Sequence, residues 1–159
     1  MNEADLTERP EWSQKVVNAM VKAQLWTRDN RDETAQLLSS SSEQKYTPHK
    51  LEILQRVLTP AANDIDQYVS TGAIRHPEWR NQRIDFQPYP FPTYTEALVK
   101  LLKETTVEGD RAFLDNLDPV FAATDLVDDR FVKAALEANG GLRAFGLPDS
   151  YSRTEVLQV

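Results

Sequence analysis

The sequence predicts an all-α protein. Apolar residues recur at helical spacing along most of the chain, and proline and capping residues mark the points where these segments begin. Strand-like alternation is confined to residues 84–86, which are too few for a sheet. The 159 residues are enough for one domain with a sizeable core, and we expect a single helical domain.

The first helix is expected to begin at Pro10, which suits the first turn of a helix. Its apolar residues recur three or four positions apart and predict an amphipathic helix that ends near Trp26. The residues expected to form its buried stripe are Trp12, Val16, Met20 and Ala23, with Val17 and Val21 beside them.

Asn30 and Glu33 have the spacing of a capping box and predict the start of a second helix. The serines at 39–42 are expected to end it and to form a flexible link on the surface. Thr47-Pro48 predicts the start of a third helix. A fourth, short helix is expected from a capping box at Asp64 and Gln67 up to Gly72.

A proline-aromatic connector follows, with the sequence RIDFQPYPFPTYTE at residues 83–96. Its prolines exclude a helix interior or a central strand, so we expect a stiff, extended segment. Thr93 and Glu96 predict a capping box that starts the next helix. The connector aromatics Tyr89, Phe91 and Tyr94 could form a surface for a ligand or a partner, but the favoured interpretation is that they cover the core.

The second half is expected to hold a helix with Leu98, Leu101 and Leu102 on its apolar face. A short turn should follow with Phe113, Leu114 and Leu117 inward, then a helix started by Asp118-Pro119, and a last helix from about Asp128. The predicted parts of the domain are a first helical group at 9–73, the connector at 74–93, a second helical group at 94–140 and an irregular tail at 141–159.

Composition excludes several classes of site. The chain contains no cysteine, so disulfides and thiolate metal sites are absent. Its net charge of −7 disfavours nucleic-acid binding. No apolar run is long enough to cross a membrane, and the acidic residues near Met1 are unlike a signal peptide.

A basic segment stands out against the acidic background. Arg75, Arg80 and Arg83 surround Trp79, and this group could bind a small anion or an acidic partner. The alternative, which we favour, is that these arginines pair with carboxylates on the surface.

No catalytic or metal-binding motif is present in the sequence. His49 and His76 lack the spacing of metal ligands, and no cofactor is expected. The stretch 108–129 is rich in carboxylates, which could serve acid–base chemistry or calcium binding. Asp110, Asp118 and Asp128 stand where helix caps are expected, so structural capping is the favoured interpretation, and we expect no enzyme.

Four segments resemble a known family. The sequences PEWSQKVVNAMVKAQLW (10–26), NRDETAQLLS (30–39), DFQPYPFPTY (85–94) and DLVDDRFV (125–132) resemble the C-terminal half of ABC-transporter substrate-binding proteins of the nitrate/sulfonate/taurine type, which are related to the thiamine-precursor-binding proteins.

This resemblance implies two α/β lobes that close over a small oxyanion-bearing solute and deliver it to a permease. The chain would then be the helical C-terminal piece of such a protein, arising from a truncated frame, a fragment or a split subunit. Its partners would be permease subunits or the missing N-terminal lobes, and its apolar helix faces would favour homo-oligomers. The family implies a periplasmic location, and a stand-alone product without a signal would be cytoplasmic. No ligand residue carries over.

The expected function is therefore that of a solute-binding component, or its C-terminal fragment, of an ABC importer for nitrate, sulfonate or a similar small molecule. The alternative is a helical protein-interaction or assembly module without ligand binding. An enzyme that uses the carboxylates comes third.

Overall fold

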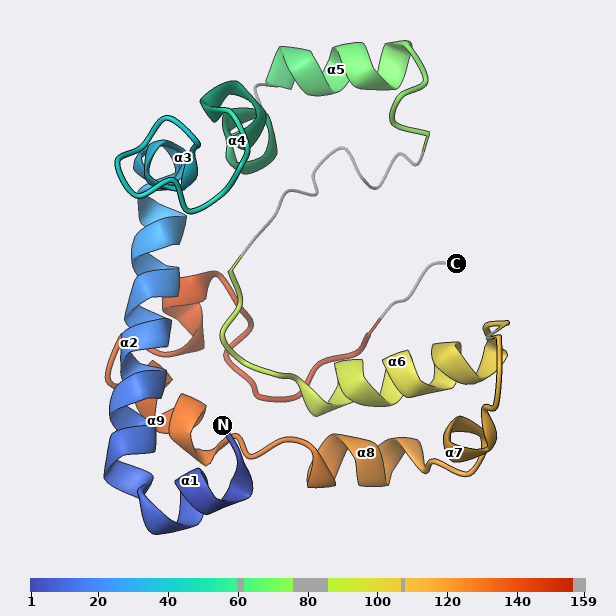
Figure 1. Cartoon of the computed structure of the whole chain (residues 1–159). Coiled ribbons are helices and arrows are strands. Elements are labelled where there is room, and N and C mark those ends of the chain that lie inside the picture. The colour runs from blue at the N-terminus through green and yellow to red at the C-terminus, as the bar shows by residue number, and fades with distance from the viewer. Residues whose placement is uncertain (60–61, 76–85, 107, 156–159) are drawn as a thin grey trace. The chain divides into compact units, whose positions relative to one another are not determined.

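The computed structural model describes residues 1–59, 62–75, 86–106 and 108–155 (Figure 1). Within these ranges the regular structure is helical and contains no strand, which confirms the all-α prediction. The elements are α1 (Glu3–Glu8), α2 (Pro10–Asp29), α3 (Arg31–Leu38), α4 (Leu51–Leu58), α5 (Ala62–Ser70), α6 (Pro92–Glu104), α7 (Ala112–Asp115), α8 (Pro119–Asp125), α9 (Arg130–Glu137) and the 3-10 helix η2 (Leu142–Phe145).

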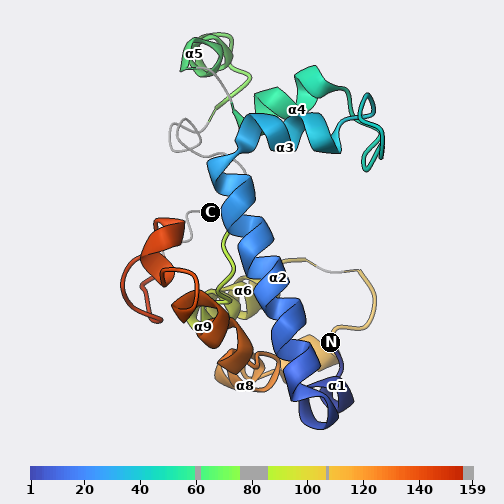
Figure 2. The same cartoon turned by 90° about the vertical axis from the view of Figure 1, so that its left-hand side faces the viewer.

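The chain divides into two compact units. The first comprises Met1–Ala23 with Gln87–Val159, and the second comprises Gln24–Phe86. The long helix α2 contributes residues to both (Figure 2). These boundaries differ from the predicted groups 9–73 and 94–140, because the first part of α2 joins the C-terminal helices. Whether the chain folds as one domain stays a prediction.

The first unit begins with α1, a helix that was not predicted from the sequence. The Asn2 side chain caps it by accepting a hydrogen bond of 2.8 Å from the Asp5 amide. Ser13 on α2 is fully buried and its hydroxyl donates to the Asp5 carbonyl oxygen at 2.9 Å. The buried Ser13 side chain therefore links α2 to α1 through this hydrogen bond.

The buried side predicted for α2 is confirmed in part, because Val21 is buried and Val16 and Val17 are half-buried. Trp12 and Met20 were also expected to be buried but are 46% and 57% exposed, whereas Ser13 is fully buried. Near the start of α2 the contacts with neighbouring helices are polar: Ser13 bonds to α1, and the Gln14 amide donates to the Phe131 carbonyl oxygen of α9 at 2.9 Å. Trp12, although it is the largest apolar side chain there, therefore lies beside these contacts and not in them.

The rest of the first unit is built around α6, α8 and α9. In Figure 1, α6 and α8 lie alongside each other, and they pack through Val99 on α6 and the small residues Ala122 and Ala123 on α8. Small residues allow two helices to approach closely. The helix α9 and the segment after it bury Phe131, Ala135, Leu136, Leu142, Phe145 and Leu147.

The second unit has a smaller core, in which α3 packs on α4. Ala35 is fully buried and Leu58 is 4% exposed. Arg31 at the start of α3 is also buried, and its guanidinium donates to the Leu58 carbonyl oxygen at 3.3 Å. A cation at the C-terminal end of α4 interacts favourably with that helix's dipole.

Three of the predicted capping boxes are wrong. Helix α6 begins at Pro92 after Phe91, and the Thr93 hydroxyl donates instead to Glu155 Oε1 at 3.1 Å. Asn30 does precede α3, but its side chain donates backwards to the Trp26 carbonyl oxygen at 2.8 Å. Helix α5 begins at Ala62, before the predicted cap at Asp64.

The start of α4 also differs from the prediction. Thr47-Pro48 does not start the helix, which begins at Leu51. Thr47 instead bonds to the Leu38 carbonyl oxygen through both its amide and its hydroxyl, at 3.1 and 2.8 Å. A tertiary partner therefore replaced the local cap.

Two further expectations were wrong. The tail from residue 141 is not irregular throughout, because η2 lies in it and buries Phe145. Phe113 was expected to point inward but is 72% exposed, since α7 is only four residues long and buries Leu114 alone.

In the described ranges no helix combines the length and apolarity needed to cross a membrane.

Candidate functional site

The connector aromatics do not form a common surface. Tyr89 and Phe91 are 5% and 3% exposed, whereas Tyr94, already inside α6, is 48% exposed. The interpretation that these residues cover the core holds for Tyr89 and Phe91, and a connector surface of all three is wrong. Pro88 and Pro90 keep the segment extended until Pro92 takes the first position of α6.

Tyr89 is held by the start of α9. Its hydroxyl donates to Asp129 Oδ2 at 2.6 Å, and the Lys133 ammonium lies 2.8 Å from the same oxygen. Asp129 is the residue that precedes α9, and Lys133 stands one turn further along. The Tyr151 ring packs on the Tyr89 ring with 4.6 Å between their centroids. The network therefore joins the connector, α9 and the C-terminal segment.

The ionisation of this network is strongly biased. Burial raises the pKa of Tyr89 well above its ordinary value, and the hydrogen bond to Asp129 raises it further. Burial also acts to raise the pKa of Asp129, but the hydrogen bonds from Lys133 and Tyr89 outweigh it and lower that pKa. A neutral Tyr89 phenol beside an Asp129 carboxylate is thus the stable pair at neutral pH.

A second set of contacts holds the C-terminal segment against the connector. The Arg153 guanidinium lies over the Phe91 ring at 4.0 Å and forms an ion pair of 2.5 Å with Glu155. Glu155 also accepts the hydrogen bond from Thr93 on α6. Glu155 thus joins Arg153 to Thr93, and the raised pKa of Tyr89 keeps its hydroxyl protonated as the donor to Asp129. The cluster therefore fixes the connector, and with it the start of α6, to α9 and the C-terminal segment.

The helix that this cluster positions has an apolar stripe exposed to solvent. Tyr94, Leu98 and Leu102 are spaced four residues apart, and they are 48%, 40% and 40% exposed. At about 100° per residue they fall on one side of α6. The charged residues of α6 lie on the other side; they are Glu96, Lys100, Lys103 and Glu104. Only Val99, at the edge of the stripe, is buried.

The acidic stretch mostly serves helix ends. Asp118 Oδ1 accepts a hydrogen bond of 2.8 Å from the Phe121 amide and caps α8, as predicted. Asp110 accepts from the Ala112 amide at 2.9 Å. Asp128 is not the cap of α9, a position held by Asp129, and it pairs with Arg130 at 2.8 Å. Among the residues that the structure describes, no group of three or more histidine or acidic side chains could hold a metal ion.

Of the basic segment that was predicted to bind an anion or an acidic partner, the structure describes only Arg75. Arg75 is exposed in the segment after α5. Trp79, Arg80 and Arg83 lie outside the described residues, as does His76. The anion or partner patch therefore stays a prediction.

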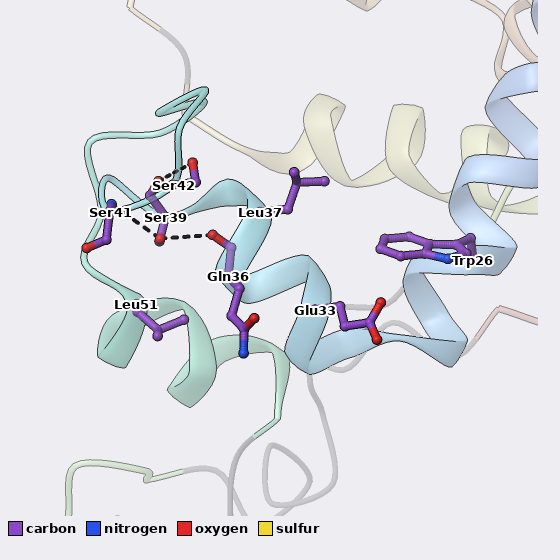
Figure 3. Close-up of a pocket in the computed structure, with 8 residues that line it drawn as sticks. All are labelled: Trp26, Glu33, Gln36, Leu37, Ser39, Ser41, Ser42 and Leu51. Carbon is purple, nitrogen blue, oxygen red and sulfur yellow. Dashed lines mark hydrogen bonds between the residues drawn. The ribbon is translucent and has the colours of Figure 1, made fainter.

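The second unit contains a cavity that was not predicted from the sequence. It has a volume of about 590 Å³ and lies over one side of α3 (Figure 3). Its lining residues are Trp26, Glu33, Gln36, Leu37, Ser39, Ser41, Ser42 and Leu51. The sequence assigned these residues to helix ends, a helix face and a flexible link, and no local motif signals that the fold brings them together.

The link of serines is in fact a closed loop. The Ser40 amide donates to the His49 carbonyl oxygen at 2.8 Å, and the Thr47 amide reaches back to Leu38 at 3.1 Å. Ser39 is 2% exposed, so it belongs to the core of the second unit and not to its surface. A loop whose two ends are bonded together keeps its position next to α3.

Comparisons with protein-family models, with curated proteins and with solved structures found no match to this chain. The class that the fold defines is that of an all-α protein with two compact units.

Proposed function

We propose that the protein is a helical assembly module that binds a second copy of itself through α6. The observation that carries this proposal is the exposed stripe of Tyr94, Leu98 and Leu102. Apolar area removed from water contributes about 25 cal/mol per Å². A helix with one apolar side left open gains stability when that side is covered.

A second copy suits this stripe because the stripe is self-complementary. In an antiparallel pair related by a two-fold axis at Leu98, Tyr94 of one copy lies against Leu102 of the other. The stripe carries no charge, so such pairing buries no ion, although each copy carries a net charge of −7. The surface is small, which corresponds to a reversible dimer with a Kd of roughly micromolar or weaker.

The test is the oligomeric state of Leu98→Asp. Wild-type protein should increase in mass with concentration by light scattering, up to about 1 mM. Leu98→Asp should stay monomeric, because the two-fold axis would place two carboxylates against each other. Ile53→Asp on α4 is the matched control, since Ile53 is 46% exposed in the other unit. A monomeric wild type, or a Leu98→Asp variant that dimerises equally, contradicts the proposal.

The second candidate function is solute binding for an ABC importer, with permease subunits as partners. It is supported by the family resemblance of four segments. A ligand that binds only the folded state raises stability by RT ln(1 + [L]/Kd). Thermal unfolding with nitrate, sulfonates and taurine therefore tests it, and an unchanged melting temperature with all of these would leave assembly as the function.

A further inference from the structure

The cavity over α3 is formed by four consecutive parts of the second unit. Trp26 stands near the end of α2, and Glu33, Gln36 and Leu37 lie on one side of α3 (Figure 3). The serine loop supplies the far wall and Leu51 begins α4. All of these residues belong to one compact unit.

The far wall is held in place without a ligand. The Ser39 hydroxyl donates to the Gln36 carbonyl oxygen at 2.9 Å and accepts from the Ser41 amide at 3.3 Å. The Ser42 hydroxyl donates to the Ser39 carbonyl oxygen at 2.8 Å. A preformed wall reduces the entropy lost when a small molecule binds.

The lining of the cavity carries a negative charge, which favours a positively charged ligand. Glu33 is the one ionised side chain among the lining residues, and within the described ranges its carboxylate makes no hydrogen bond or ion pair. Trp26 is 43% exposed and presents an aromatic ring to the same space. A carboxylate and an indole ring both attract cations, whereas an anion would meet only repulsion from Glu33.

The lining also excludes an inorganic ion. Calcium and magnesium are held by several oxygen ligands, and a single carboxylate beside an indole ring does not supply them. Leu37 and Leu51 offer apolar surface that a hydrated metal would leave unused. The Gln36 amide and the Ser41 hydroxyl can bond to a polar group at the other end of a ligand.

We propose that this cavity binds a small organic ammonium ion of the size of an amino alcohol. The cationic head lies between Trp26 and Glu33, the hydrocarbon part lies on Leu37 and Leu51, and a terminal hydroxyl bonds to Ser41 or Gln36. The site is independent of assembly through α6, so the failure of either proposal leaves the other standing.

The probe is choline, and its control is 3,3-dimethylbutan-1-ol, which has the same shape without the charge. Trp12→Phe and Trp79→Phe leave Trp26 as the single tryptophan, so its emission reports on the cavity. We expect a saturable change with choline at roughly millimolar concentration, and binding of the neutral alcohol roughly 5-fold weaker.

Variants identify the residues that bind. Glu33→Gln should weaken choline roughly 3- to 5-fold, and Trp26→Leu, measured by calorimetry, should weaken it by a similar factor. Glu43→Gln is the matched control, because Glu43 is exposed in the same loop and does not line the cavity; its affinity should equal that of the wild type.

Three results would overturn the proposal: no saturable change up to roughly 100 mM choline, equal binding of choline and its neutral counterpart, or unchanged affinity in Glu33→Gln. Circular dichroism checks that each variant keeps its helices. Should Glu33→Gln lose them, the comparison of choline with the neutral alcohol on the wild-type chain decides the question.

Discussion

The hydroxyl of Tyr89 donates a hydrogen bond of 2.6 Å to Oδ2 of Asp129, a residue forty positions further along the chain. The bond fixes the proline-aromatic connector to the start of α9, immediately before the connector becomes α6. It therefore lies at the base of the helix whose exposed stripe we propose as the assembly surface.

Tyr89→Phe should lower the free energy of unfolding by about 1–2 kcal/mol, because it removes a part-buried hydrogen bond to a charged acceptor while keeping the ring contacts with Phe91 and Tyr151. Urea denaturation at neutral pH measures the change. Tyr46→Phe is the matched control; its side chain is 63% exposed, and its effect should stay within about 0.5 kcal/mol. Equal stability of the two variants would mean that the Tyr89 bond adds nothing to the fold.

The same pair predicts how stability depends on pH. The pKa of Tyr89 is raised in the folded state, so its contribution is complete below the ordinary value of 10.0 and is lost as pH rises above it. The pKa of Asp129 is lowered, so its contribution is present above the ordinary value of 3.8 and is lost as pH falls below it. Burial of Tyr89 and the hydrogen bonds to Asp129 are the respective causes.

Urea midpoints measured across pH test this dependence. Above pH 10.0 the wild type should lose stability more steeply than Tyr89→Phe, in which the ionising phenol is absent. All other titratable groups are the same in both proteins, so the difference between the two curves reports on Tyr89. Parallel curves for the two proteins would contradict the assigned shift.

Arg111→Gln should loosen the C-terminal end of α6. The Arg111 guanidinium donates to the carbonyl oxygens of Lys103 and Thr105 at 2.6 and 3.1 Å, which lack partners within the helix. We expect a loss of about 1 kcal/mol and faster hydrogen exchange of the Thr105 amide. Arg143→Gln is the control, because its ion pair with Asp149 is exposed and should contribute little. Unchanged exchange at Thr105 would show that Arg111 is no cap.

Asp118→Ala should destabilise the protein by about 1 kcal/mol through loss of the cap on α8. Asp118→Asn keeps an oxygen that can accept from the Phe121 amide, and it should retain most of the stability. Denaturation of the full-length variants distinguishes the two. If both lost the same amount, the charge of Asp118 rather than its hydrogen bond would be responsible.

The helical nature of the chain could be predicted because helix-forming periodicity and proline positions are local properties. Pro10, Pro92 and Pro119 each stand at the first position of a helix, where a missing amide donor has no consequence. Asp118 was predicted as a cap and is one, because its acceptor and its donor lie three residues apart.

The missed features depend on partners that are distant in the sequence. Thr93 was expected to cap its own helix, but Glu155 offers it a charged acceptor. Trp12 was expected to be buried, but α1 and α9 bond to the neighbouring Ser13 and Gln14. Neither outcome can be read from a local pattern, because the competing partner is absent from it.

By itself the sequence determined the fold class, the approximate positions of most helices and the absence of cysteine chemistry, since these follow from composition and from spacing within one or two turns. Only the tertiary structure decided that Tyr89 and Phe91 are buried, that the stripe on α6 is left open and that Trp26 and Glu33 line one cavity. The physical reason is that burial and polar pairing are settled by whichever surfaces meet, and these come from segments far apart along the chain.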